Sequence, residues 1–259
     1  MSDSLVQPAN AARRRVSKLG LAKVFWRSLF LQAAWNPQGM QNLGFAYALE
    51  PALGELHPDA AARAQAALRH LEFFNCHPYL AAAILGGAVQ LEERVASGEA
   101  PPESVTQFKR ALGPPFAALG DGFFWLALRP AAALAAAISE PLLGMGCLAV
   151  FLLLYNGVHL SSRLWLFVRG YQLAEGLVEE VARAQVPFAT TLLKASGAVL
   201  AGAIAARAVL LAGLHHRPWH ALLVGSTIVA AAALLPRLRL WIALYIALGL
   251  GLALGSGLF

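Results

Sequence analysis

Polar side chains that could take part in chemistry gather between residues 35 and 121, where short apolar runs alternate with turns. Trp35, Asn36 and Gln41 lie in one turn, Trp-Asn-Pro-Gln-Gly-Met-Gln-Asn, which is dense in amide groups and chain breakers. Amides in broken apolar segments are typical of polar transport sites, because irregular backbone at membrane depth is tolerated only where it lines a cavity. The turn is therefore a candidate site, although Asn36 could instead cap a helix and Trp35 could anchor at a membrane interface.

A helix is expected to start at Pro58-Asp59 and to carry an apolar face through Phe74. Glu72 and Asn75 are three residues apart and share another face of that helix. A carboxylate and an amide on one face could bind a polar solute together. In the structural alternative, Glu72 forms an ion pair with Arg69 or another nearby arginine.

Asp121 follows a short apolar segment, 111–120, and lies between two glycines ahead of the first long apolar stretch. This position suits the N-cap of the next helix, where a carboxylate satisfies backbone N–H groups that have no helical partner. In the functional alternative, Asp121 lines a polar path through the membrane, and Arg129 in the same stretch could pair with it.

The sequence shows no pattern of an enzyme or a metal site. His70 and His77 lie in an apolar motif and are expected to make structural hydrogen bonds. The two cysteines, Cys76 and Cys147, exclude a disulfide scaffold and a cysteine-rich metal site. Signatures of serine hydrolases, phosphate loops and zinc proteases are lacking too, so we expect no catalytic residue, metal or cofactor.

The composition of the 259-residue chain indicates a membrane protein, because 58% of its residues are hydrophobic and 13% are charged, against about a quarter charged in soluble domains. Segment 78–91 is too short to cross a bilayer and is expected to be re-entrant or interfacial, with a polar loop at 92–110 after it. Five segments approach the length and apolarity of a membrane span: 122–138, 141–160, 187–214, 219–235 and 240–259.

The formal net charge of +6 is explained by basic residues in the connections between these segments. Basic connections favour the cytoplasmic side of a membrane. The N-terminal arm, 161–186 and 236–239 are therefore expected in the cytoplasm, and the connection at 139–141, which has no basic residue, on the outside.

Residues 16–34 are predicted to form an amphipathic helix with Trp26 and Phe30 on its apolar stripe and Lys23 and Arg27 off it. This pattern suits a membrane interface with anionic lipid, and nucleic acid is not expected as a partner. The predicted fold class is all-α: a polytopic membrane protein with an N-terminal interfacial amphipathic helix, re-entrant segments and about five transmembrane helices. We expect a basic arm with the amphipathic helix, a core with broken or re-entrant helices, and a transmembrane region, at residues 1–34, 35–121 and 122–259.

Four stretches of the sequence are similar to one known family. RSLFLQAAWNPQGMQNLGFAYALEPAL (27–53), HLEFFNCHPYLAAAILG (70–86), LGDGFFWLALRP (119–130) and RGYQLAEGL (169–177) resemble the IID subunit of mannose-family phosphotransferase permeases. The resemblance implies a bacterial inner-membrane subunit, with its N-terminus in the cytoplasm, that forms a hetero-oligomeric channel for a hexose-type sugar with a IIC subunit. It also implies that separate IIA and IIB proteins carry the phosphoryl group, so that no phosphohistidine is expected in this chain.

The resemblance gives the polar residues a substrate. Sugars are uncharged and rich in hydroxyls, so their recognition needs convergent amides and carboxylates and an aromatic ring. The expected sugar-binding residues are those singled out above: Trp35, Asn36, Gln41, Glu72, Asn75 and Asp121. Pro37-Gln38-Gly39 and Ala83 depart from the residues usual in the family, which leaves a transport-inactive regulatory or receptor-like relative as the alternative.

Overall fold

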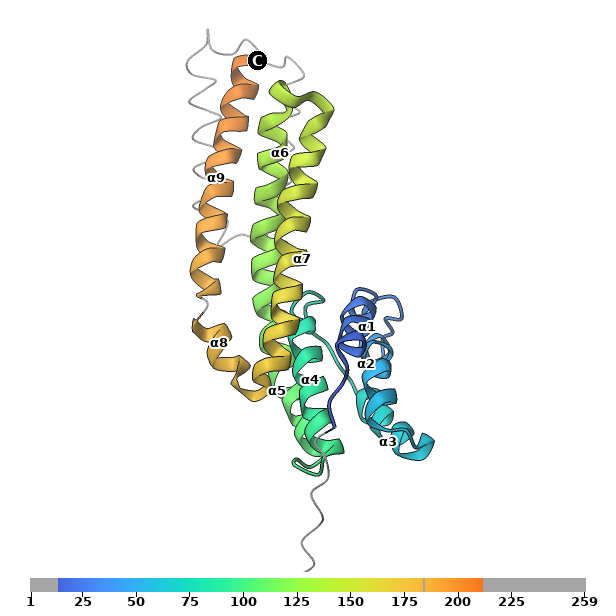
Figure 1. Cartoon of the computed structure of the whole chain (residues 1–259). Helices are drawn as coiled ribbons and strands as arrows, with labels where there is room; N and C mark the ends of the chain where they lie inside the picture. The colour runs from blue at the N-terminus through green and yellow to red at the C-terminus, as the bar shows by residue number, and fades with distance from the viewer. Residues whose placement is uncertain (1–13, 184, 212–259) are drawn as a thin grey trace, which may run out of the picture. The chain divides into compact units, whose positions relative to one another are not determined.

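The computed structural model describes residues 14–183 and 185–211, and these residues form helices joined by turns (Figure 1). The chain divides into two units, Met1–Leu200 and Ala201–Phe259, and every contact discussed below lies within the first. The predicted spans 219–235 and 240–259 lie outside the described residues. In chain order the helices are α1 (Lys18–Ser28), α2 (Asn42–Leu56), α3 (Ala60–His70), α4 (Ala81–Ala96), α5 (Glu103–Gly120), the π-helix η1 (Asp121–Leu128), α6 (Arg129–Leu143), the 3-10 turn η2 (Gly144–Gly146), α7 (Cys147–Leu173), the 3-10 turn η3 (Ala174–Gly176), α8 (Leu177–Arg183) and α9 (Val186–Leu211).

Helix α3 starts where the sequence predicts. Asp59 is its N-cap, and the Asp59 carboxylate accepts a hydrogen bond of 2.8 Å from the backbone N–H of Ala62. The predicted end is wrong, because the helix stops at His70 and does not run through Phe74. Residues beyond His70 leave the helix because the backbone of Phe74 pairs with Gly39 and Gln41 of the preceding turn. Glu72 and Asn75 are thus not on one helical face.

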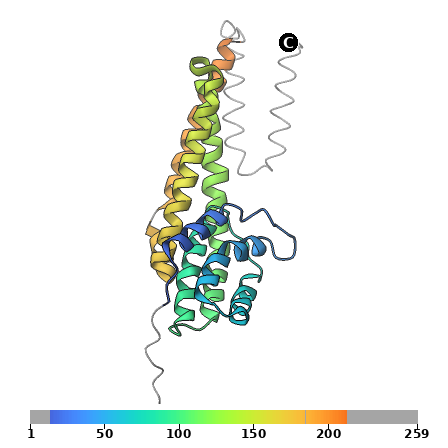
Figure 2. The ribbon, with the colours of Figure 1, turned by 45° about the vertical axis from the view of Figure 1, so that its right-hand side comes forward.

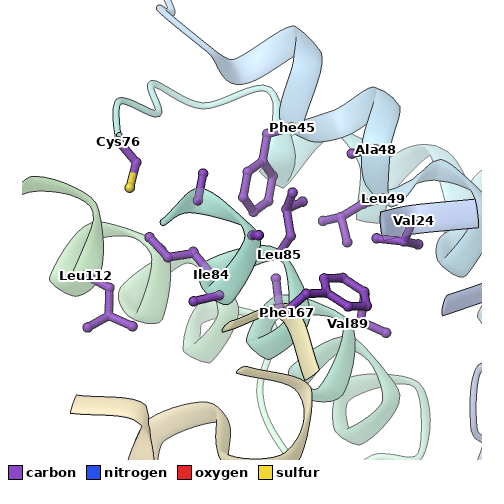
Figure 3. Close-up of a cluster of buried hydrophobic side chains, with 14 of the residues drawn as sticks. Val24, Phe45, Ala48, Leu49, Cys76, Ile84, Leu85, Val89, Leu112 and Phe167 are labelled. Carbon is purple, nitrogen blue, oxygen red and sulfur yellow. The ribbon is translucent and has the colours of Figure 1, made fainter. Parts of the chain in front are cut away.

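Helix α4 is the centre of the hydrophobic core. It lies against α2, α5 and α7, and side chains from all of these elements surround Ile84 and Leu85 (Figure 3). The helix runs five residues beyond the predicted segment 78–91, so that Glu92 and Glu93 are buried inside the protein. The polar connection expected at 92–110 is correspondingly wrong, because α5 already starts at Glu103.

The close approach of α4 and α7 depends on two glycines. A methyl group at Gly86 would overlap the backbone carbonyl oxygen of Phe167, and one at Gly170 would overlap that of Ala83. Each helix therefore offers a residue without a side chain where the backbone of the other passes. This packing explains the glycine at position 170 in the motif at 169–177.

Helices α5, η1 and α6 form one uninterrupted helical stretch, although the sequence predicts a break at Gly120-Asp121-Gly122. Asp121 has helical dihedral angles, φ −59° and ψ −45°, so its prediction as an N-cap is wrong. The widened π-helical turns end just before Pro130, and the backbone N–H of Arg129 donates to Phe124, five residues earlier. Such a bulge accommodates a proline, which lacks an N–H and crowds the preceding turn.

Helices α6 and α7 form a hairpin of two long helices that lie side by side (Figures 1 and 2). The chain reverses at Gly144–Gly146, where Gly144 has a φ of +50°, and not at the predicted 139–141. Most outward side chains of this hairpin are apolar and exposed, as lipid contact requires. Among the residues that the structure describes, two helical stretches are long and apolar enough to cross a membrane: Glu103–Arg183, which contains the reversal, and Val186–Ile204.

Helix α1 is shorter than the predicted 16–34 and ends at Ser28, after which the chain continues in turns. Its face with Gly20, Val24 and Ser28 is buried in the protein. Trp26 and Phe30, from the predicted apolar stripe, are exposed. The apolar stripe therefore points away from the protein core.

Candidate functional site

Three of the four sequence motifs meet at residues 74–77. The side-chain amide of Gln41 donates from Nε2 to the carbonyl oxygen of Cys76 at 2.8 Å, and Oε1 accepts from the N–H of Cys76 at 3.1 Å. The backbone N–H of Gln41 also donates to the carbonyl oxygen of Phe74 at 2.9 Å. From the third motif, Gly120 packs directly against the side chain of His77. The predicted site segments, far apart in sequence, are therefore adjacent in the fold.

Asn36 shapes the turn that carries Trp35. Its Oδ1 accepts from the N–H of Gly39 at 2.7 Å, and its Nδ2 donates to Oδ1 of Asn42 at 3.0 Å. Asn42 in turn donates to the carbonyl oxygen of Leu71 at 2.6 Å, which ties the turn to the end of α3. The indole of Trp35 is 52% exposed. Both hydrogen-bonding atoms of the Asn36 side chain are engaged within the turn, whereas Trp35 faces outward.

The candidates Glu72, Asn75 and Asp121 have different surroundings. Glu72 accepts from Nη2 of Arg110 at 3.0 Å in an exposed ion pair, which is the structural alternative predicted for it with a different arginine. Asn75 is exposed and Asp121 is partly buried, and neither side chain makes a hydrogen bond within the described residues. No ion pair joins Asp121 to Arg129 in this part of the chain. Asp121 lies near Cys76, and burial together with that negative charge raises the pKa of the Cys76 thiol.

A buried charge cluster beneath these segments was not anticipated from the sequence. The Glu92 carboxylate is fully buried and accepts from Arg69 Nε at 2.7 Å, Arg69 Nη2 at 3.0 Å and His70 Nε2 at 2.9 Å. Lys109 donates to the carbonyl oxygen of Arg69 at 3.0 Å and lies over the ring of Phe45. Burial alone raises the pKa of Glu92, but the hydrogen bonds from His70 and Arg69 outweigh it and lower the pKa to about 2. The cluster holds α3, α4 and α5 together. The sequence feature that could have indicated it is the pair Glu92-Glu93 at the end of the apolar segment 78–91.

A second unanticipated group, which we call the ring cluster, consists of His77, Tyr79, Phe124, Trp125 and His159. The His77 ring stacks on Phe124 with centroids 5.1 Å apart and touches Tyr79 and Trp125 at 4.9 and 4.8 Å. Tyr79 stacks on His159 of α7 at 4.3 Å. The cluster thus joins the 75–80 loop to η1 and α7, directly beside Asp121. The sequence feature that could have indicated it is the four-residue spacing of Tyr155, His159 and Arg163 on α7.

The fourth motif, 169–177, serves packing and ion pairing. Besides the close approach at Gly170, Tyr171 donates from its hydroxyl to Glu93 at 2.8 Å, and Arg169 pairs with Glu180 at 2.6 Å.

Among the residues that the structure describes, no group of three or more histidine, cysteine or acidic side chains could hold a metal ion.

Comparison with known proteins identifies relatives of this chain. The model of the PTS system mannose/fructose/sorbose family IID component matches residues 15–215. The mannose-specific EIID component of the PTS system of Escherichia coli O6:H1 is 37% identical over 186 residues, which cover 70% of this chain and 64% of that protein. The fructose permease IID component of Bacillus subtilis is 31% identical over 196 residues, which cover 75% of this chain and 71% of that protein.

Two solved structures share the fold. A chain of the cryo-EM structure of the mannose transporter ManYZ in complex with microcin E492 superposes with a TM-score of 0.60 at 27% identity, covering 94% of this chain and 97% of that chain. A structure described as a membrane protein superposes with a TM-score of 0.66 at 33% identity, covering 73% and 70%.

The helices, the apolar hairpin and these similarities define an all-α membrane component of a sugar phosphotransferase system. The chain belongs to the mannose/fructose/sorbose family of IID components. It spans less than two thirds of the length of the Escherichia coli relatives it matches, 64% and 60%.

Proposed function

We propose that this chain is the IID subunit of a sugar permease, which binds a hexose-type sugar together with a IIC subunit and moves it across the bacterial inner membrane. Transport is coupled to phosphorylation of the sugar by IIA and IIB proteins, and this chain carries no phosphoryl group itself. Family membership and the similarity to a chain of the ManYZ mannose transporter support this function.

One structural observation carries the proposal: the motifs at 27–53, 70–86 and 119–130 meet around residues 74–77. At this junction Trp35 offers an exposed indole, while Asn75 and Asp121 offer an amide and a carboxylate. We propose that these three groups contact the sugar. Glu72 comes three residues before Asn75 and pairs with Arg110, and Asn36 and Gln41 position the turn on which Trp35 lies.

The mechanism that we propose is alternating access, in which the polar junction is opened in turn to each side of the membrane. Helices α6, α7 and α9 cross the bilayer, with the N-terminus in the cytoplasm. The exposed apolar stripe of α1, which includes Trp26 and Phe30, lies in the membrane interface. Lys23 on the same helix is exposed and is placed to meet anionic lipid, whereas Arg27 pairs with Glu50 at 2.6 Å.

The direct test is sugar uptake by proteoliposomes that contain this chain and its IIC subunit, with IIA, IIB and a phosphoryl donor supplied inside. We expect uptake of mannose or a related hexose that depends on this chain. A stable complex that takes up no hexose would overturn the transport function and favour a regulatory relative.

Asp121→Asn provides a site-specific test, because it removes the charge but keeps the size of the side chain. We expect uptake to fall about tenfold or more, as loss of a charge-assisted hydrogen bond to a sugar hydroxyl implies. Glu103→Gln is the matched control, since Glu103 is an exposed carboxylate at the start of the same helical stretch. Full uptake and unchanged stability of Asp121→Asn would remove Asp121 from the site.

A further inference from the structure

Three polar side chains follow one another at four-residue spacing on α7: Tyr155, His159 and Arg163. They lie on one face of this mostly apolar helix, and that face points into the protein toward the 75–80 loop. Arg163 is only 4% exposed. Ionisable groups at such positions are costly and rarely retained without a function, so this face calls for a ligand or a partner.

The three side chains surround the ring of Tyr79. His159 stacks on it at 4.3 Å, and the guanidinium carbon of Arg163 lies 6.0 Å from its centroid. The hydroxyl groups of Tyr79 and Tyr155 are 3.1 Å apart. His77, from the same loop as Tyr79, touches that ring edge-on at 4.9 Å.

Three nitrogen atoms of this group are buried and have no hydrogen-bond partner among the described residues: Nε2 of His77, Nδ1 of His159 and Nε of Arg163. Buried polar atoms are normally paired, and an unpaired one loses its hydration without compensation. Three such atoms around one ring indicate that something else hydrogen-bonds there when the protein works.

The partners of these residues define which atoms donate and which accept. His77 accepts the backbone N–H of Tyr79 at Nδ1, 3.3 Å away, so its Nε2 carries the hydrogen and is a donor. His159 contacts Oδ1 of Asn156 through Nε2 at 3.1 Å, so Nε2 donates and Nδ1 is left as an acceptor. The open positions are thus two donors, on His77 and Arg163, and one acceptor, on His159.

This mixture indicates a hydroxyl-bearing ligand and disfavours an anion. A carboxylate or phosphate could accept from His77 and Arg163 but could offer no hydrogen to His159, whereas a hydroxyl both donates and accepts. The charge of Arg163 does not require an anion either. It donates through Nη2 to the carbonyl oxygen of Ser28, the last residue of α1, where the helix dipole is negative.

The surroundings allow a ligand to approach. Tyr155 and His159 are partly buried, and Trp125, whose ring touches His77, is 37% exposed. Phe124 stacks on His77 and also lines a neighbouring apolar cavity of about 230 Å³, so the cavity adjoins the cluster at this ring. Both aromatic residues belong to η1, and π-helical turns frequently mark functional sites.

We propose that His77, His159 and Arg163 form a hydroxyl-binding site for the transported sugar, with Trp125 as the aromatic surface for the sugar ring. The site adjoins Asn75 and Asp121 through the 75–80 loop and η1, so that it extends the sugar site and rests on the proposed function. His159 accepts a hydrogen from one sugar hydroxyl, and His77 and Arg163 donate to hydroxyl oxygens.

The test uses the complex of the full chain with its IIC subunit in nanodiscs and measures the Kd for mannose. His159→Phe keeps a ring on Tyr79 but removes both nitrogens, and we expect its Kd to rise about tenfold or more while the apparent Tm changes little. His57→Phe is the matched control, because His57 is also partly buried but lies outside the ring cluster, with its Nε2 3.9 Å from the Glu92 carboxylate. His159→Asn, which retains hydrogen-bonding atoms, should have an intermediate Kd and replaces His159→Phe if that variant does not fold.

Deoxy derivatives of mannose separate a direct contact from a structural effect. If His159 binds a given hydroxyl, the derivative that lacks it should bind the wild type more weakly but should lose no further affinity in His159→Phe. An unchanged Kd for mannose, or additive effects for every derivative, would overturn the site while the proposed function stands. A wild-type complex that binds no hexose at all would overturn both.

Discussion

Glu92 and Glu72 are both paired with an arginine, but only Glu92 is buried. Replacement of Glu92 by Gln leaves Arg69 without its counter-charge in the interior, which costs about 3–5 kcal/mol of folding free energy. Glu72→Gln breaks an exposed pair and costs at most about 1 kcal/mol. Thermal unfolding of the purified protein should therefore show a large fall in apparent Tm for Glu92→Gln and almost none for Glu72→Gln. Equal shifts would contradict the buried cluster.

His77 makes stability depend on pH. Burial, then the positive charge of Arg163 and, once it is protonated, that of His159 lower the pKa of His77 from 6.5 to about 4. The folded protein therefore holds this imidazole neutral, and its contribution is complete above pH 6.5 and is lost as the pH falls toward 4. The loss amounts to about 3 kcal/mol at the acid end.

In His77→Gln this titration is absent. The difference in apparent Tm between pH 7.5 and pH 4.5 should therefore be smaller in the variant than in the wild type. Identical pH profiles for the two proteins would show that His77 is not held neutral by the fold.

Glycine packing decides how closely α4 and α7 approach. Gly86→Ala and Gly170→Ala each place a methyl group onto the backbone of the opposite helix, so the helices must separate. We expect a loss of about 1–3 kcal/mol for each, as overpacking usually costs. Gly157→Ala, on the same α7 but with open space beside it, is the control and should be neutral or slightly stabilising. Unfolding of the three variants at the same temperature as the wild type would refute the close crossing.

The starts of helices were easier to predict than their ends, for a physical reason. Asp59 caps α3 through a hydrogen bond to a residue three positions away, which is local information. The end of α3 at His70 depends on the pairing of Phe74 with the turn before α2, which the local sequence does not encode. The prediction of Asp121 as an N-cap was wrong for a similar reason. Gly120 packs against the side chain of His77, far away in sequence, and does not end the helix.

The candidate site was predictable in part. The turn at 36–41 could be recognised because its amides and breakers are adjacent in sequence. The ring cluster could not, since His77 and His159 are 82 positions apart and meet only through the packing of α7 on the 75–80 loop. The membrane character required no tertiary information, because it depends on composition and length alone.

For the molecule as a whole, the orientation in the membrane can be tested with single cysteines. Met145 is exposed in the α6–α7 turn, and Glu103 is exposed at the start of α5. In a Cys147→Ser background, with Cys76 buried, Met145→Cys should react with an impermeant maleimide added outside intact cells, and Glu103→Cys only after lysis. The reverse pattern would invert the proposed topology.

The uninterrupted stretch from Glu103 to Leu143 has a mechanical consequence. At 1.5 Å per residue it is a rod of about 60 Å; near one end Lys109 donates to Arg69 in the buried charge cluster, and the other end is the α6–α7 turn. Phe124 and Trp125 lie near its middle. If the rod tilts by about 5° around that point, its two ends move about 3 Å in opposite directions. The ring cluster then lies at the pivot point of the tilt, so its contacts can persist while both ends of the helical stretch move.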